Sequence, residues 1–428
     1  MLRRTARAGS AMVGLLAAAL LAAGACEGGR GDGAGRDPGA AGPSAADYHA
    51  GAAGVGDPYY PTYGNGGYDV RNYLVKVKYE PRTDVLAGDV TITARATENL
   101  SGFNLDLSGL TVRSVRVNDA QAPFERDGNE LVLRPSQRLP AGSDFTVRVT
   151  YDGVPGAASP DLGEGGFRRT GDGAYAIGEP ESASTWFPVN DHPLDKATYA
   201  FEITVPNGLS AVSNGVPRGS AKTGGWTTWR WSESSPMASY LATVVIGNYR
   251  VTTGNHAGKP VVTAVAGSLP AGGDADRAMA RTTEIADFLA TRFGPYPFDA
   301  YGGVVVDDEA LGFALETQSR PVYASRFFRP GGPRPDATWV VAHELAHQWF
   351  GDSVSVHHWR DIWLNEGFAS YAEWLWEEHA LGRPVQTSFE AEYTSTPDEV
   401  WSVAPADPGR ANLFSRSVYR RGAMALHA

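Results

Sequence analysis

The chain has 428 residues, of which 42% are hydrophobic and 20% are charged, and its formal net charge at pH 7 is −11. This length and composition predict a globular protein with two or three domains. The acidic balance argues against a nucleic-acid-binding protein, because such proteins usually present a basic surface to the phosphate backbone.

The amino-terminal residues have the pattern of an export signal. Three arginines precede an apolar run, rich in Ala and Leu, that extends from Ala11 to Ala23. The run is shorter than the roughly 20 residues that span a membrane, so a permanent transmembrane helix is the weaker interpretation. It ends in Ala23-Gly24-Ala25-Cys26, which resembles the bacterial lipobox, although Ala23 stands where the lipobox usually has Leu. We therefore expect residues 1–26 to be a signal peptide and the protein to be an exported bacterial cell-surface lipoprotein, anchored to the membrane through Cys26.

The residues that follow differ from both the signal and the folded part. Cys26 is the only cysteine, which excludes an intrachain disulfide and a cysteine nucleophile in the mature chain. Residues 27–57 consist largely of Gly, Ala and Pro with scattered charges. Such a composition buries too little apolar surface to fold, so it predicts a flexible tether.

A long segment after the tether has the alternating pattern of β-strands. Apolar and polar residues alternate in the stretches 73–79, 90–94, 145–151 and 199–205, which turn-forming residues separate. Residues 58–250 are therefore predicted to form an all-β, sandwich-like domain.

The pattern becomes mixed from residue 251, and we expect residues 251–428 to form a second domain containing both helices and strands. One predicted helix begins with Asp336 as its N-cap and has Gly351 just past its end. The predicted strands are 261–266 and 304–306, and the predicted helices are 274–293, 336–350 and about 365–379.

The residues that indicate chemistry are His343-Glu344-Leu345-Ala346-His347, an HExxH pattern inside the second of these helices. Residues four apart lie one turn above each other in a helix, so both imidazoles can face one ion, and Glu344 can reach a water bound to it. Glu366 is available as a third ligand, separated from His347 by the eighteen residues 348–365. Two His and one Glu leave zinc an open position, which is typical of a catalytic site.

Two other histidines compete as ligands. His357 and His358 lie in the predicted loop between the two helices. We interpret them as loop residues or as supports of the ligands rather than as ligands.

The HExxH pattern with its eighteen-residue spacer and Glu resembles the M1 family of zinc aminopeptidases, the gluzincins. Residues 68–107 resemble the opening strands of the family's β-domain, and Phe187 to Pro193 resembles its FPCFDEP stretch. The resemblance implies a multidomain protein, with an N-terminal all-β domain followed by an α+β thermolysin-like zinc peptidase domain. Because family members continue into helical C-terminal modules, we expect residues 251–428 to be a C-terminally incomplete catalytic domain.

The resemblance also assigns two residues that bind the substrate's amino group. The family's GAMEN motif is matched by the stretch from Gly312 to Gln318, in which Glu316 keeps the acid and Thr317 stands where the family has Asn. We expect this stretch to form a sheet edge beside the metal-binding helix, where an extended peptide could pair. The second amino-binding position falls on Glu179, with Glu181 as the alternative.

Near the end of the chain, Val418 to Ala423 resembles the family's YxKGA stretch, with Arg421 in place of the usual Lys. The resemblance implies that Tyr419 stabilises the transition state.

The implied function is zinc-dependent release of N-terminal residues from peptides with a free amino end. One zinc ion would be the cofactor and Glu344 the general base, while zinc and Tyr419 would meet the charge on the carbonyl oxygen. A zinc endopeptidase is one alternative, for which the altered GAMEN stretch leaves room. A catalytically silent scaffold fragment is another, against which the retained site residues argue. No residue favours an epoxide-hydrolysing relative.

Overall fold

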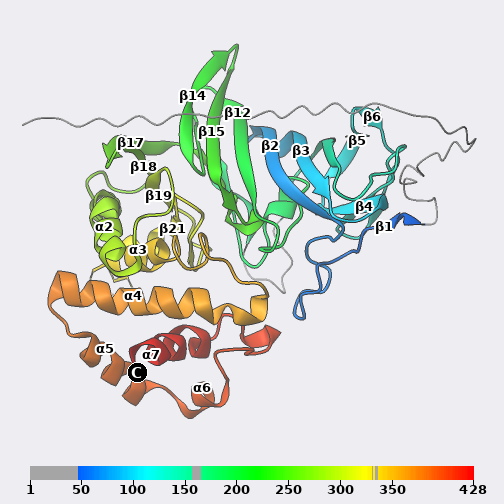
Figure 1. Ribbon diagram of the computed structural model, residues 1–428. Coiled ribbons are helices and arrows are strands. Elements are labelled where there is room, and N and C mark those ends of the chain that lie inside the picture. The colour runs from blue at the N-terminus through cyan, green and yellow to red at the C-terminus, as the bar shows by residue number, and fades with distance from the viewer. Residues whose placement is uncertain (1–46, 157–164, 330, 333–335) are drawn as a thin grey trace, which may run out of the picture. The chain divides into compact units, whose positions relative to one another are not determined.

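A computed structural model describes residues 47–156, 165–329, 331–332 and 336–428 (Figure 1). The expected signal peptide, Cys26 and most of the expected tether lie outside the described residues. Among the residues described, no helix is long and apolar enough to cross a membrane.

The amino-terminal half is built on an eight-stranded sheet, in which β12 lies parallel to β2 and the other neighbours are antiparallel. The alternation predicted from the sequence is confirmed: in β2, Tyr73, Val75 and Val77 are buried and the lysines between and after them are exposed. In sheet order the strands are β14 (Val216–Thr223), β15 (Trp226–Met237), β12 (Ala197–Pro206), β2 (Tyr68–Glu80), β3 (Val85–Ala96), β9 (Asp144–Gly153), β5 (Thr111–Val117) and β6 (Ala120–Gln121).

Two four-stranded sheets contribute to the same hydrophobic core as the large sheet. Aromatic rings fill this core: Tyr73 stacks on Tyr199 with ring centroids 4.8 Å apart, and Phe187 meets Tyr73 edge-on at 5.9 Å. The first of these sheets contains β1 (His49–Ala50), β4 (Leu100–Asp106), β8 (Glu130–Leu133) and β7 (Phe124–Asp127), and the second contains β10 (Gly166–Arg169), β11 (Ala174–Ile177), β16 (Val244–Gly247) and β13 (Ser210–Ser213).

The predicted flexible tether is wrong for residues 47–57, which are packed against the folded part. His49 and Ala50 pair with β4, and Asp57 is only 1% exposed. The Asp57 carboxylate accepts hydrogen bonds from the backbone N–H groups of Tyr59, at 2.8 Å, and Trp359, at 2.9 Å. The composition of the segment gave a wrong prediction because backbone pairing and one buried carboxylate, rather than apolar side chains, hold it in place. Its glycines permit close contact: a Cβ at Gly51 would lie 2.5 Å from a backbone carbonyl oxygen.

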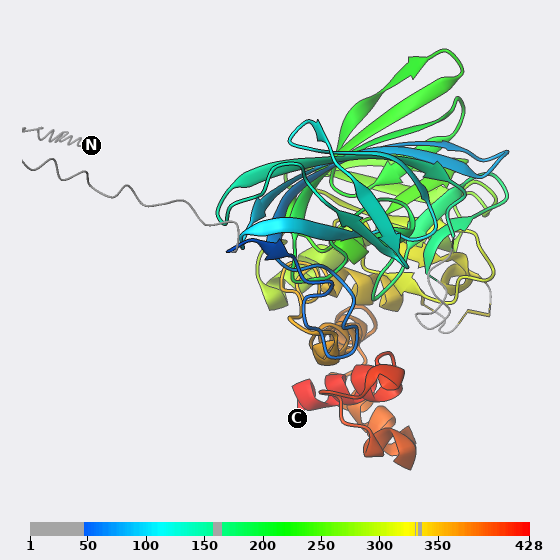
Figure 2. The same ribbon diagram turned by 90° about the vertical axis from the view of Figure 1, so that its right-hand side faces the viewer.

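The carboxyl-terminal half combines a five-stranded sheet with helices. In sheet order the strands are β17 (Tyr249–His256), β18 (Lys259–Ala266), β19 (Tyr301–Val306), β21 (Val322–Ala324) and the edge strand β20 (Ala314–Leu315). The main helices are α1 (Asp274–Ala280), α2 (Thr282–Phe293), α3 (Thr338–Ala346), α4 (Trp363–Leu381), α5 (Val385–Ser395), α6 (Asp398–Ser402) and α7 (Gly422–His427), and a π-helical turn, η8 (Ser417–Arg421), precedes α7. In both views α5, α6 and α7 lie on the side of α4 that faces away from the sheets (Figures 1 and 2).

Two predicted helices differ in detail from those observed. The helix expected over 274–293 is interrupted at Arg281, where the Thr282 hydroxyl donates to the carbonyl oxygen of Met279. The helix expected over 336–350 is α3, which is shorter at both ends. Asp336 nevertheless accepts a hydrogen bond from the Thr338 N–H at 2.9 Å, as a capping residue does.

Candidate active site

The three predicted metal ligands converge on one point. His343 lies in α3, His347 is the C-cap residue of that helix one turn later, and Glu366 lies in the first turn of α4. The Oε2 atom of Glu366 lies 3.2 Å from His343 Nε2 and 3.5 Å from His347 Nε2. One ligand atom from each of the three residues lies within 4.8 Å of the others, and all three side chains are buried.

The other ring nitrogens are held by groups that sequence reasoning missed. His343 Nδ1 lies 2.9 Å from Glu373 Oε1, and His347 Nδ1 lies 3.0 Å from the carbonyl oxygen of Phe350. These contacts fix both rings with Nε2 toward Glu366, as is usual for histidines that bind a metal. A signal for Glu373 did exist, because it follows Glu366 by two helical turns on the same face of α4. Two imidazole nitrogens and a carboxylate, each with its orientation fixed, fit zinc.

The predicted base Glu344 and the predicted ligand Glu366 have opposite electrostatic environments. Burial raises the pKa of Glu344 to about 8, against the lowering effect of His343 and His347. Burial also acts to raise the pKa of Glu366, but the charges and hydrogen bonds of the two histidines outweigh it and hold that pKa at about 2. Such a separation suits Glu366 to a permanently ionised role and Glu344 to proton transfer.

Glu316 and Glu179 lie on the same side of the site. Glu316 offers a carboxylate oxygen within 4.8 Å of ligand atoms of Glu344 and His347, and it accepts a hydrogen bond from the Tyr240 hydroxyl at 2.9 Å. Glu179 follows β11 and lines the same cavity, and its Oε1 is buried with no hydrogen-bond partner among the residues described. Burial, followed by the charges of Glu316 and Glu366, raises the pKa of Glu179 well above its usual range.

The residues that the sequence offered as alternatives, Glu181, His357 and His358, lie outside this site. Glu181 is not among the residues that line the cavity, and its charge acts on Tyr63 and Asp191. His357 and His358 contact each other at 3.1 Å, and neither belongs to a ligand cluster in the described part of the chain.

The stretch that resembles GAMEN is a loop built around a sheet edge. Residues 312–316 line the cavity, and β20 pairs only with β21. The hydroxyl of Thr317 donates to the carbonyl oxygen of Arg320 at 2.7 Å, so it closes the turn rather than facing the cavity. Arg320 is fully buried and donates to the carbonyl oxygens of Ser213, Gly215 and Val262. The loop that carries Glu316 is thus tied to both halves of the molecule.

Tyr419 also lies at the site. Its ring is roughly parallel to that of His343, at 16° with centroids 6.0 Å apart, and it lines the cavity. Tyr419 lies in the π-helical turn η8, a conformation that is frequent at functional sites. Two glycines allow this approach, because a Cβ at Gly422 would lie 2.8 Å from the Cα of Gly367 on α4.

A cavity of about 430 Å³ joins the parts of the site. The residues described above that line it are His343, His347, Glu366, Glu344, Glu316, Glu179 and Tyr419. Glu316 and Glu179 line it together with His347, whereas Trp339 and Val340 line it beyond His343. Because Val340 and Trp339 precede His343 by three and four residues, they lie one helical turn further from His347. The cavity therefore extends along α3, from an acidic part to an apolar part that also contains Phe327, whose ring lies 5.8 Å from that of Trp339.

Comparison with known proteins agrees with this arrangement. The family model for the Peptidase M1 N-terminal domain matches residues 69–241, and that for the Peptidase family M1 domain matches residues 277–426. A crystal structure of an M1 zinc metallopeptidase from Deinococcus radiodurans is 31% identical, with a TM-score of 0.77, and the match covers 88% of this chain and 85% of that one. A structure of a mutant of that protein bound to a Tyr-Ser-Ala substrate is 30% identical, also with a TM-score of 0.77, and covers 87% and 85%. The chain therefore belongs to the M1 peptidase family.

Mammalian members of the family are similar over shorter stretches. Aminopeptidase N of Canis lupus familiaris is 31% identical over 206 residues, which are 45% of this chain and 21% of that protein. Glutamyl aminopeptidase of Homo sapiens is 32% identical over 211 residues, which are 47% of this chain and 22% of that protein. The match with these relatives thus spans about a fifth of their length.

Proposed function

We propose that this protein is a zinc-dependent aminopeptidase that releases N-terminal residues from peptides with a free amino end. One observation carries the proposal. Glu316 is buried beside the candidate metal ligands, and half-buried Glu179 lines the same cavity with its Oε1 buried and without a hydrogen-bond partner among the described residues. A pair of acids with a buried, unpartnered oxygen is stabilised by a bound cation, and a peptide's terminal ammonium supplies one next to the scissile bond.

His343, His347 and Glu366 would hold the zinc ion, which when bound supplies a Lewis acid for the scissile carbonyl and for the attacking water. Glu344 accepts the proton of that water and transfers it to the leaving amine, a role that its raised pKa favours. The Tyr419 hydroxyl donates a hydrogen bond to the carbonyl oxygen as negative charge develops there.

The cavity also suggests how a peptide is oriented. With its ammonium between Glu179 and Glu316, the peptide can extend along the edge strand β20 and past His343. Its second residue then meets the apolar part of the cavity formed by Trp339 and Val340. This direction places the first peptide bond, rather than an internal one, at the metal ligands.

A ratio of two rates tests the proposal. We expect kcat/KM for a free-amine peptide to exceed greatly that for its N-acetylated twin, and Glu316→Gln to lower only the first, by about ten- to a hundredfold. Glu181→Gln is the matched control, because this neighbouring acid does not line the cavity, and it should keep the ratio. A wild-type ratio near one would instead indicate a zinc endopeptidase, and no hydrolysis of either peptide would indicate a silent scaffold.

We also propose that the protein is exported and anchored by a lipid on Cys26. The supporting observation is the apolar run that ends in Ala23-Gly24-Ala25-Cys26. Cys26→Ser should move the protein from the membrane fraction of expressing bacteria to the soluble fraction. Unchanged membrane association of the variant would contradict the lipid anchor.

A further inference from the structure

We propose that Arg420 is a positioning residue for the metal site: it holds the carboxylate of Glu373, which in turn fixes the ring of His343. The inference rests on the proposed zinc site and assigns part of the zinc affinity to a residue outside the ligand set.

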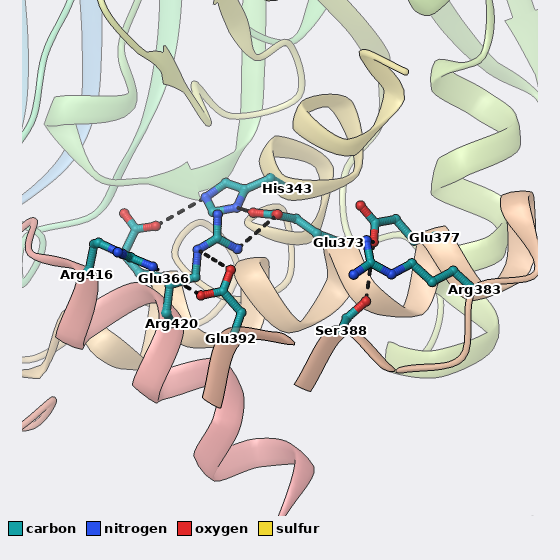
Figure 3. Close-up of polar contacts among 9 residues, drawn as sticks. All are labelled: His343, Glu366, Glu373, Glu377, Arg383, Ser388, Glu392, Arg416 and Arg420. Carbon is teal, nitrogen blue, oxygen red and sulfur yellow. Dashed lines mark hydrogen bonds and ion pairs between the residues drawn. The ribbon is translucent and has the colours of Figure 1, made fainter. Parts of the chain in front are cut away.

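Glu373 bridges a ligand and an arginine. It lies on α4, is 1% exposed, and uses its two oxygens separately: Oε1 lies 2.9 Å from His343 Nδ1, and Oε2 accepts a hydrogen bond from Arg420 Nη1 at 3.3 Å. Figure 3 shows the guanidinium of Arg420 next to the carboxylate of Glu373. The orientation of the carboxylate is therefore set by His343 on one side and by Arg420 on the other.

The contacts continue outward as a chain of alternating charge (Figure 3). Arg420 Nε lies 3.7 Å from Glu392 Oε1 on α5, and Glu392 Oε2 lies 3.4 Å from Arg416 Nη2. Burial raises the electrostatic cost of a charge unless a partner offsets it, and Glu373, whose side chain is 1% exposed, is more deeply buried than Glu392, at 22%. Arg420 supplies a positive charge as that partner. Its planar, forked guanidinium also restrains the orientation of the Glu373 carboxylate.

A carboxylate on the outer nitrogen of a ligating histidine fixes the ring and strengthens the inner nitrogen as a donor. Without Arg420, Glu373 could rotate away from His343 toward other donors, and the imidazole would lose its fixed direction. The turn η8 acts on His343 through two neighbouring residues. Tyr419 stacks on the His343 ring, and Arg420 holds Glu373, the carboxylate partner of that ring. Arg421 does not share this role, since it donates to the carbonyl oxygens of Val400 and Trp401.

The experiment measures zinc affinity directly. The full chain and its variants Arg420→Gln, Arg420→Lys and Arg416→Gln are stripped of metal, and the Kd for zinc alone is obtained by competition with a chromophoric chelator. Arg416→Gln is the matched control, because the ion pair of Arg416 in the described part of the chain is with Glu392 rather than with Glu373. Thermal unfolding of each metal-free protein reports whether it is folded.

We expect Arg420→Gln to raise the zinc Kd about tenfold, as the loss of an outer partner of a ligand typically does. Arg420→Lys should raise it less, because lysine keeps the charge and loses the fork. Arg416→Gln should leave it within about twofold, because an exposed ion pair contributes little.

An unchanged Kd in a folded Arg420→Gln variant overturns the inference, as does an equal increase in Arg416→Gln. If Arg420→Gln does not fold, the lysine variant decides, and an unchanged Kd there is the overturning result. A wild-type chain that binds no zinc would refute the proposed zinc site itself, which is a different outcome from loss of the inference alone.

Discussion

The β-rich half and the α3–α4 pair bury their side chains for different reasons. In β2 the buried positions hold Tyr and Val, and the charged residues of the strand face solvent. In α3 and α4 the buried positions include His343, Glu344, Glu366 and Glu373, whose charges compensate one another. Burial of apolar groups stabilises a fold, whereas burial of charge costs free energy that must be offset locally. Substitutions in the α3–α4 pair should therefore change activity, whereas substitutions in the β-rich half should change the free energy of unfolding.

The largest expected effect separates activity from structure in the helix pair. Glu344→Gln keeps the size and burial of the side chain but removes the base, so we expect kcat to fall by about 10²- to 10⁴-fold. Zinc content, measured by atomic emission, and the melting temperature should stay close to those of the wild type. Near wild-type turnover in this variant would show that another group is the base.

In the β-rich half we expect a substitution to lower stability without changing zinc affinity. Phe201→Ala removes a fully buried ring that stacks on Tyr199 and Trp186, and we expect a loss of about 3 to 5 kcal/mol in the free energy of unfolding. Because this ring is remote from the ligands in the sequence and not part of the cavity wall, the zinc Kd of the folded variant should not change. Urea unfolding and chelator competition measure the two quantities. A large loss of zinc affinity would show that the two regions are coupled.

A smaller effect concerns an acid in the β-rich half that lacks full compensation. Burial raises the pKa of Glu130 to about 7, against the lowering effect of Asn65 and Arg126, and one of its oxygens has no hydrogen-bond partner among the described residues. The folded protein then holds this proton at pH values where the unfolded chain has lost it. The stabilisation is fully present below pH 4.5, the usual pKa of Glu, and is lost as the pH rises through about 7.

Glu130→Gln should therefore flatten the decline in stability between these pH values, by about 1 kcal/mol after allowance for partial exposure. Urea unfolding at pH 5 and pH 7.5 of the wild type and the variant provides the measurement. Glu125→Gln, at an exposed position of the neighbouring strand, is the control. Identical pH profiles for wild type and Glu130→Gln would show that the carboxyl group is already ionised in the fold.

The contrast between the apolar β-rich half and the charged α3–α4 pair also explains which features could be predicted from the sequence. Period-two alternation predicted β2, β3, β9 and β12, because apolar burial repeats along a strand. The spacing of His343, His347 and Glu366 predicted that these three side chains meet at one point, because one helical turn fixes the first pair. Glu373 and Arg420 could not be paired from sequence, since their contact depends on how η8 crosses α4. The segment 47–57 was mispredicted because backbone pairing and the single carboxylate of Asp57 leave almost no trace in composition.

The contact between Gly367 and Gly422 has a mechanical consequence. Gly367 directly follows the ligand Glu366, and Gly422 comes three residues after Tyr419, so the two backbones meet without an intervening side chain. Side chains between helices can change rotamer and absorb a displacement, but a backbone contact cannot. We therefore expect this junction to transmit a shift of the segment 417–427, which carries Tyr419, directly to the backbone next to Glu366.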